Sequence, residues 1–128
     1  MADKTLKQQI GQIGEDIACK FLVKHDYLIL LRNYRKSFGE IDIICKKNNK
    51  IHFIEVKAVS RQTQLTTFDA HRPEDNIHAK KLTRIGRTIQ AYIYENNLEP
   101  EWQFDVITVY LDHSAKSASV HTMFNLIL

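Results

Sequence analysis

The stretch Gly39–Lys57, with the sequence GEIDIICKKNNKIHFIEVK, contains the most informative pattern of the chain. Residues 39–46 and 51–57 each alternate in polarity along the chain, which is typical of β-strands. The segment between them contains Asn48-Asn49, and asparagine tolerates the positive φ angles of a tight two-residue turn. The stretch therefore predicts a β-hairpin that turns at these two asparagines.

The turn determines which residues face each other across the hairpin. Counting back from it places Asp42 opposite Glu55, and Glu40 opposite Lys57. Opposed residues in a sheet have Cβ atoms about 4.5–5.5 Å apart. Two carboxylates at about 5 Å repel each other by roughly 3 kcal/mol at an effective dielectric constant of about 20. A cation, a raised pKa or a basic side chain must therefore compensate this acidic pair.

Two interpretations of the acidic pair stay open. In the first, the side chains form an ordinary charge network in which Lys57 neutralises Glu55 and Glu40, and Asp42 lies at the solvent edge. In the second, the two carboxylates hold a divalent cation, since Mg²⁺ favours sites with one or two carboxylates and retained waters. The second interpretation predicts a site with chemistry. The position of Glu40 opposite Lys57 fits an ion pair better than a metal ligand, which predicts a structural role for Glu40.

The segment Leu6–Lys24 predicts the first helix, because its apolar residues recur at helical spacing. Glu15 lies at the edge of the apolar side, in a lane of small and apolar residues. Small neighbours would let the helix, and this carboxylate, approach a sheet closely. Glu15 is therefore a candidate to join Asp42, Glu55 and Lys57 in one site.

The remaining segments predict the rest of an α/β fold. They indicate a strand at 27–33 covered on both faces, a loop at 58–72, a helix from Pro73 to about Asn96-Asn97, and strands at 102–110 and 120–127. The order helix, three strands, helix, two strands predicts a five-stranded mixed sheet flanked by helices. The length predicts a single domain over residues 1–128.

Composition excludes other classes of protein. No run of 18 apolar residues occurs, so we expect no membrane-spanning helix and no membrane partner. The first residues lack the apolar core of a signal peptide. Cys19 and Cys45 form no CxxC pair, which predicts free thiols in a reducing compartment. Together these features predict a cytoplasmic protein.

Basic residues gather in the first half of the chain. Residues 1–64 hold 12 Lys and Arg against 7 Asp and Glu, although the whole chain has a net charge of only +3. This half could face a polyanion, or it could present a solvated basic face. Candidate phosphate contacts come before the hairpin and along the second helix: Arg32, Arg35, Lys36, Lys80, Arg84 and Arg87.

The ordered motifs resemble a known family. Residues 39–42, GEID, followed by Glu55-Val56-Lys57, resemble the core of the PD-(D/E)XK nuclease superfamily. With the further stretches GEDIA at 14–18, RNYR at 32–35, KKL at 80–82 and FDVI at 104–107, the sequence is similar to the YraN-type family of endonuclease-like bacterial proteins. These stretches span most of the chain.

The resemblance implies a restriction-endonuclease-like fold, similar to Holliday junction resolvases, and a metal-dependent endonuclease that cleaves DNA, branched or structured DNA included. It implies that Asp42, Glu55 and the Val56 carbonyl hold Mg²⁺ or Mn²⁺. It also implies that Lys57 orients or activates the attacking water and that Glu15 contacts the metal through water. Glu15, Asp42, Glu55 and Lys57 are thus the implied catalytic residues.

One position departs from the family pattern. The family commonly has an arginine two residues after the motif lysine, where this sequence has Val59, and Arg61 follows two residues later. Arg61 is therefore a candidate to take over a phosphate contact. By analogy, junction resolvases act as dimers because two symmetric nicks need two sites, which suggests a homodimer. The alternatives are a non-catalytic nucleic-acid-binding or scaffold module with the same fold, and a protein-interaction domain.

Overall fold

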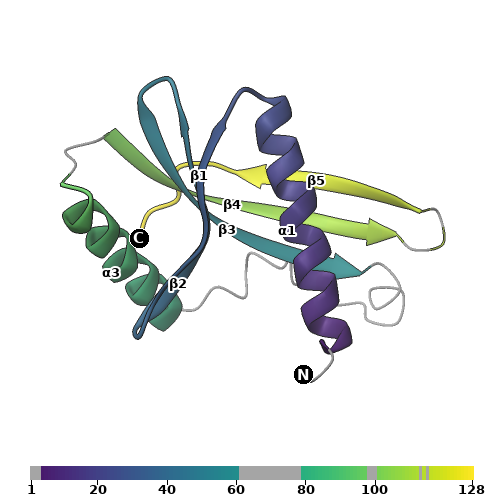
Figure 1. Ribbon diagram of the computed structural model, residues 1–128. Coiled ribbons are helices and arrows are strands. Elements are labelled where there is room, and N and C mark those ends of the chain that lie inside the picture. The colour runs from purple at the N-terminus through teal and green to yellow at the C-terminus, as the bar shows by residue number, and fades with distance from the viewer. Residues whose placement is uncertain (1–3, 61–78, 98–100, 113, 115) are drawn as a thin grey trace.

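The computed structural model describes residues 4–60, 79–97, 101–112, 114 and 116–128. These residues form two helices and one five-stranded sheet (Figure 1). The elements are α1 (Leu6–Lys24), β1 (Leu28–Lys36), β2 (Gly39–Lys47), β3 (Lys50–Ser60), α3 (Ala79–Glu95), β4 (Glu101–Asp112) and β5 (Ser117–Met123). The predicted fold class is confirmed, and the arrangement is consistent with a restriction-endonuclease-like fold. That residues 1–128 form one domain stays a prediction.

The sheet is mixed because it contains both parallel and antiparallel pairs of neighbouring strands. Its order is β1-β2-β3-β4-β5, with β3 and β4 parallel and every other neighbouring pair antiparallel. Parallel neighbours need a long crossover connection, and α3 comes between β3 and β4 in the chain. The hairpin of β2 and β3 therefore joins an antiparallel edge of the sheet to its parallel centre.

The hairpin turn forms as predicted. Asn48 and Asn49 have φ angles of 52° and 63°, which are the positive values that a tight two-residue hairpin turn requires. The regular pairing of β2 with β3 runs from the turn to Ile43 opposite Ile54, in the predicted register. At the next residue, Asp42, the carboxylate Oδ2 accepts a hydrogen bond of 2.8 Å from the Val56 backbone amide. At this position a hydrogen bond from the β3 backbone to a side chain therefore follows the last regular backbone pair.

The alternation of side chains along β2 is interrupted at this same point. Simple alternation would place Ile41 and Ile43 on the same face of the sheet. Instead, Ile41 packs in the cluster beside α3, whereas Ile43 packs in the cluster beside α1. The alternation of β2 is therefore interrupted at Asp42, while further along the strand Ile44 and Cys45 again lie in different clusters.

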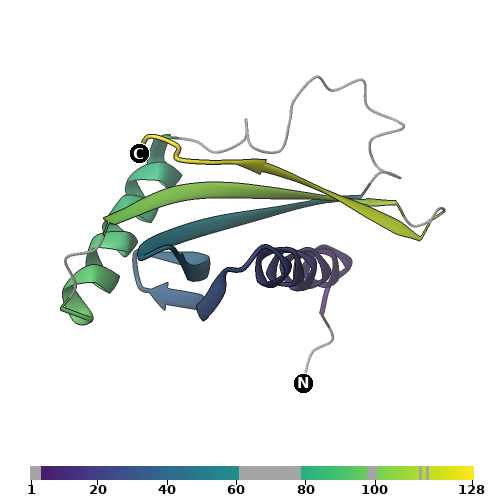
Figure 2. The same cartoon turned by 90° about the horizontal axis from the view of Figure 1, so that it is seen from above.

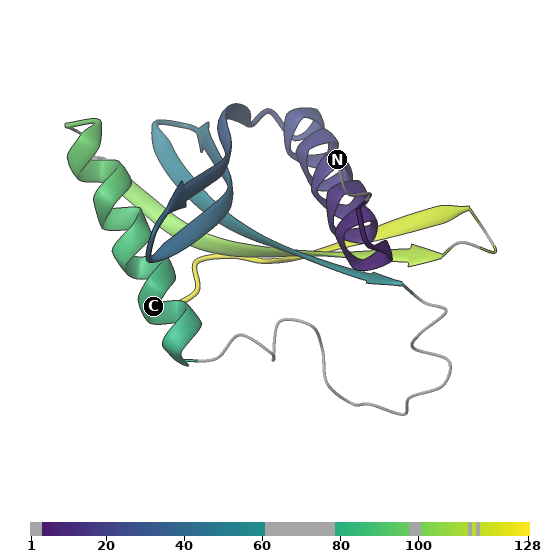
Figure 3. The same ribbon diagram turned by 60° about the horizontal axis from the view of Figure 1, so that its bottom comes forward.

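Two apolar clusters hold the helices against the sheet. The cluster beside α3 contains Ile85, Ile89 and Tyr92 of that helix, packed against Phe53 and Phe104. The cluster beside α1 is built around its buried residues Ala18 and Leu22 and the inner residues of β2, β3 and β4. Figures 1 and 3 show α1 crossing β3 and β4, and α3 lying beside β2. Figure 2 shows the same two helices well separated along the strands.

Gly14 brings α1 close to the sheet. A Cβ atom at this position would lie 2.6 Å from the Cβ of Ala58 on β3, a separation that real side chains do not tolerate. The start of the same helix is fixed by a capping box, in which Thr5 Oγ1 accepts from the Gln8 amide and the Gln8 side chain accepts from the Thr5 amide. Together these contacts place the next residue, Glu15, against the sheet.

Several predicted boundaries are wrong. The strand expected to be covered on both faces is the edge strand β1, and its Leu28 is 63% exposed. The expected loop begins later, because β3 continues along β4 to Ser60. The last strand ends at Met123, after which the Asn125 amide donates to Asp105. The rest of the expected loop, Arg61 and the helix start at Pro73 lie outside the described residues.

Two expectations from composition can be compared with the structure. In the described residues, no helix is both long and apolar enough to cross a membrane. Cys19 and Cys45 are free thiols, as predicted, and Cys45 is buried.

Candidate functional site

Asp42 lies where negative charge concentrates. Its side chain is half-buried on β2 and is held by the Val56 amide. Burial first, and then the charges of Glu55, Glu15 and Glu40, raise the pKa of Asp42 from 3.8 to about 7 against the lowering effect of the Val56 amide. The carboxylate is therefore unfavourable in its charged form unless positive charge arrives.

Glu15 is fixed at the junction of α1 and β1. It is only 8% exposed, and its Oε1 accepts hydrogen bonds of 3.0 Å from Arg32 Nε and from Asn33 Nδ2. Arg32 also donates to Asp16 Oδ1 at 2.8 Å, so its guanidinium links two adjacent acids of the helix. Asn33 adopts a φ of 54°, a left-handed conformation that asparagine tolerates well. Arg32 and Asn33 thus position the Glu15 carboxylate.

A hollow of about 410 Å³ collects several predicted site residues, and we call it the acidic hollow. It is lined by Glu15, Asp42 and Val56, together with Asn33, Arg35, Glu40 and residues of the first turns of α1. The structure therefore brings the helix glutamate, the β2 aspartate and the β3 valine to one place. Glu55 and Lys57 are next to Val56 in β3 but do not line this hollow.

Glu55 is held by two lysines instead of one. It is 5% exposed, and its Oε1 lies 3.2 Å from Lys57 Nζ and 2.7 Å from Lys81 Nζ. Burial lowers the pKa of Lys57, and Lys81 lowers it further, against the effect of Glu55. Burial opposes the charge on Lys81 as well, but hydrogen bonds to Glu55 and Lys57 raise its pKa. Of the two ammonium groups, that of Lys57 loses its proton more readily.

Lys81 was missing from the predicted site. It lies four residues before Ile85, which is 2% exposed and begins the buried face of α3. Residues four apart share one side of a helix, so this spacing placed Lys81 on the inner side. The neighbouring Lys80, which was predicted as a phosphate contact, is exposed.

The predicted ion pair of Glu40 with Lys57 is wrong. Glu40 Oε2 instead lies 2.9 Å from Arg35 Nε, and both side chains are largely exposed. Arg35 is directly opposite Glu40 in the pairing of β1 with β2. Cross-strand neighbours on the β1 side thus satisfy Glu40, while the regular pairing with β3 ends at Ile43.

The predicted phosphate contacts fall into different surroundings. Arg32 is committed to Glu15 and Asp16, and Lys36 makes an ion pair with Glu95. A second hollow is lined by Arg35, Lys36, Arg84 and Arg87, whereas Lys80 does not line it. Arg61 lies outside the described residues. The six described basic residues therefore do not form one continuous patch.

The fold and site together define a small α/β protein in which buried and half-buried carboxylates lie along the β2–β3 hairpin, and two lysines contact one of them, Glu55. The chain belongs to the Uncharacterised protein family UPF0102, whose family model matches residues 14–109. This is the YraN-like family that the motifs resemble, so the family part of the resemblance is confirmed.

Individual relatives agree over most of the chain. A UPF0102 protein of Campylobacter jejuni (strain 81-176) is 40% identical over 102 residues, which cover 80% of this chain and 84% of the relative. The UPF0102 protein of Campylobacter hominis is 43% identical over 101 residues, covering 79% and 83%. The UPF0102 protein of Aliarcobacter butzleri is 38% identical over 108 residues, covering 84% and 91%. The match includes both the acidic hairpin and α1 from Gly14 onward.

Proposed function

We propose that this protein is a metal-dependent endonuclease of the PD-(D/E)XK superfamily that hydrolyses phosphodiester bonds in DNA, with branched or structured DNA among its substrates. The observation that carries the proposal is the meeting of Glu15, Asp42 and Val56 at the acidic hollow, with Glu55 and Lys57 on either side of Val56 in β3. Buried acids beside a lysine of lowered pKa are typical of hydrolytic sites.

The donor set fits Mg²⁺ or Mn²⁺. Within the described residues, no three His, Cys, Asp or Glu side chains lie close enough together to hold a metal ion by themselves. The proposed ligands are accordingly two carboxylates, Asp42 and Glu55, with the Val56 carbonyl and water, a set of oxygen donors that Mg²⁺ favours. When bound, such an ion would polarise the scissile phosphate and lower the pKa of water.

The surrounding side chains supply the rest of the chemistry. Lys57, whose pKa is lowered by burial, can accept a hydrogen bond or a proton from the attacking water when it is neutral and stabilise developing negative charge when it is charged. Lys81 contacts Glu55 and is a positioning residue for it. Glu15, held by Arg32 and Asn33, presents a carboxylate that can orient a water in the acidic hollow.

A cleavage screen tests the proposal. Single-stranded, duplex, flap and four-way DNA are incubated with Mn²⁺ and with the protein, its Lys57→Ala variant or its Asp42→Asn variant. We expect metal-dependent cleavage of at least one substrate by the unaltered protein and its loss in both variants. Lys46→Ala, which removes an exposed lysine at the other end of the same hairpin, is the control and should cleave normally. Cleavage that persists equally in Asp42→Asn would exclude the proposed site.

One observation favours a second candidate, a nucleic-acid-binding module without turnover. Glu55 is already neutralised by Lys57 and Lys81, as the charge-network interpretation requires for this residue. This alternative predicts salt-sensitive binding of junction or duplex DNA that survives Glu55→Ala and Lys57→Ala, without cleavage at any metal concentration.

A further inference from the structure

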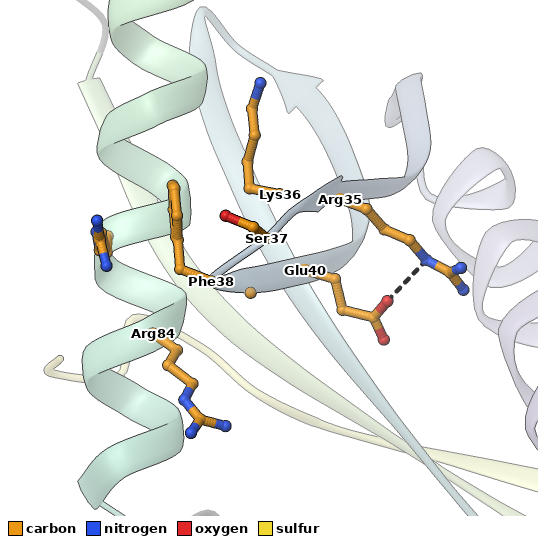
Figure 4. Close-up of a pocket in the computed structure, with 8 residues that line it drawn as sticks. Arg35, Lys36, Ser37, Phe38, Glu40 and Arg84 are labelled. Carbon is orange, nitrogen blue, oxygen red and sulfur yellow. Dashed lines mark ion pairs between the residues drawn. The ribbon is translucent and has the colours of Figure 1, made fainter.

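A second hollow, of about 630 Å³, lies between the β1–β2 turn and α3 (Figure 4). We call it the basic hollow, and the residues that matter to its chemistry are Arg35, Lys36, Phe38, Glu40, Arg84 and Arg87. Gly39 allows the turn to approach α3, because a Cβ atom there would lie 2.5 Å from Thr88 Oγ1. The close packing of the β1–β2 turn against α3 therefore forms one wall of the hollow.

Two of its four cations have no counter-charge within the described part of the chain. Arg35 pairs with Glu40, and Lys36 pairs with Glu95. Arg84 and Arg87 make no ion pair with any described residue, and they are three residues apart on one side of α3. Figure 4 shows Arg84 reaching from the helix below the β1–β2 turn. Guanidinium groups bind phosphate oxygens in a bidentate manner, so this arrangement suits a phosphate.

An aromatic ring accompanies these arginines. Phe38 is half-buried at the β1–β2 turn, and the guanidinium carbon of Arg87 lies 4.1 Å from its ring centroid. Phe38 also lines the hollow, so part of its side chain is available to an occupant. Unpaired bases stack on aromatic side chains and on arginine planes, whereas bases within a duplex already stack on each other.

The two hollows adjoin each other. Arg35 and Glu40 line both the acidic and the basic hollow, so their ion pair forms the partition between them. Figure 4 shows Arg35 and Glu40 pointing away from Phe38, toward α1. A strand that enters the basic hollow would therefore leave it beside Asp42 and Glu15.

We propose that the basic hollow binds an unpaired nucleotide of single-stranded DNA, with its phosphate between Arg84 and Arg87 and its base against Phe38. The volume lies in the range of about 300–1,000 Å³ typical of sites for single small ligands. A concave site of that size admits one nucleotide, whereas a duplex would span it. This inference deepens the proposed function, on which its catalytic meaning rests, by naming single-stranded character as the substrate feature that the protein recognises.

Binding measured without metal tests the inference. Fluorescence anisotropy follows a labelled ten-nucleotide oligothymidylate and a ten-base-pair duplex in EDTA, with circular dichroism to verify folding of each variant. We expect the Arg84→Gln/Arg87→Gln variant to bind the single strand at least tenfold more weakly, with a salt dependence reduced by one to two phosphate contacts. The matched control, Lys46→Gln/Lys116→Gln, removes the same charge from exposed positions away from the hollow and should change affinity less than about threefold.

A second pair of variants isolates the stacking. Phe38→Leu should weaken single-strand binding roughly tenfold and leave duplex binding unchanged, and Phe38→Tyr should restore it, since base–aromatic stacking depends on the ring. Equal affinities of the arginine variant and its charge control would overturn the inference. A Phe38→Leu variant that binds the single strand normally, or preferential binding of the duplex by the unaltered protein, would also overturn it. This binding assay contains no metal, so its result does not depend on catalysis. Absence of cleavage in the separate cleavage screen would contradict only the proposed nuclease.

Discussion

The two hollows on either side of the Arg35–Glu40 ion pair differ in how their charges are held. In the acidic hollow, Glu15 and Asp42 are buried or half-buried and each accepts hydrogen bonds from defined donors. In the basic hollow, Arg84 and Arg87 are exposed on one helix. Burying a charged group costs desolvation free energy, and such groups are typical of sites where a reaction takes place. An exposed charge costs little desolvation free energy and can contact a solvated polyanion. The difference suggests a division of work between reaction and capture.

The largest effect expected is on the reaction at the acidic side. Lys57→Ala should lower the rate of metal-dependent DNA cleavage by about 10²–10⁴-fold, the usual contribution of a positioned acid or base. Lys81→Ala should lower it less, because Lys81 contacts Glu55 from a second helix and Lys57 keeps its own contact. Single-turnover rates of the two variants check the order. A rate lost equally in both would indicate that the two lysines act as one unit.

The pH dependence of stability should be the next largest effect. The folded, metal-free protein keeps a proton on Asp42 up to about pH 7, because burial and then Glu55 raise its pKa from 3.8, whereas the unfolded chain releases that proton near pH 4. The contribution of the protonated carboxyl is therefore complete below about pH 4 and lost as the pH rises to about 7, by roughly 2–4 kcal/mol.

Asp42→Asn should remove this loss, since the amide oxygen can still accept from Val56 and cannot ionise. Urea unfolding in EDTA between pH 5 and pH 8 measures it. Asp16→Asn is the matched control: Arg32 lowers the pKa of Asp16, so its ionisation is complete below this range and the slope should persist. A slope that also persists in Asp42→Asn would show that another group causes it.

A third prediction concerns the close approach of α1. Gly14→Ala should lower the free energy of unfolding by about 1–3 kcal/mol, because the new methyl group overlaps Ala58 and the helix must shift. Gly11→Ala, three residues earlier in the same helix, meets nothing within 4 Å and should raise stability by about 0.5–1 kcal/mol. Thermal unfolding compares the two. Equal effects would mean that α1 does not depend on this contact.

The smallest effect should come from the partition. Arg35→Gln breaks an exposed ion pair with Glu40 and should change stability by less than about 1 kcal/mol. Because Arg35 lines both hollows, the same change should nevertheless weaken single-stranded DNA binding by several-fold, as loss of one phosphate contact does. If Arg35→Gln instead caused a large loss of stability and left DNA affinity normal, the Arg35–Glu40 ion pair would have a structural role only.

The elements that local chemistry governs could be predicted from the sequence. Asn48 and Asn49 adopt positive φ at little cost, so the turn and the register up to Ile43 follow from the residues themselves. The apolar spacing of α1 likewise places Glu15 at the edge of the buried side. Family membership supports the same motifs, which fall within the matched residues 14–109.

The features that could not be predicted from the sequence depend on contacts between segments that are far apart in the chain. The register predicted Lys57 as the partner of Glu40, but the regular pairing with β3 ends at Ile43, and Arg35 lies directly opposite Glu40 on β1. Lys81 reaches Glu55 only because α3 packs beside the hairpin. β1 is rich in leucine but lies at the edge of the sheet. The periodicity of a sequence does not indicate whether a strand will have a neighbour on both sides.

The hairpin turn, its register near the turn and the helix that carries Glu15 thus follow from the amino-acid sequence alone. The packing of distant segments determines which cation meets which carboxylate, and it brings Arg84, Arg87 and Phe38 together around the basic hollow. The difference arises from the distance along the chain over which each kind of interaction acts. Turn and helix preferences act over a few residues, whereas ion pairs and hollows depend on the packing of segments tens of residues apart.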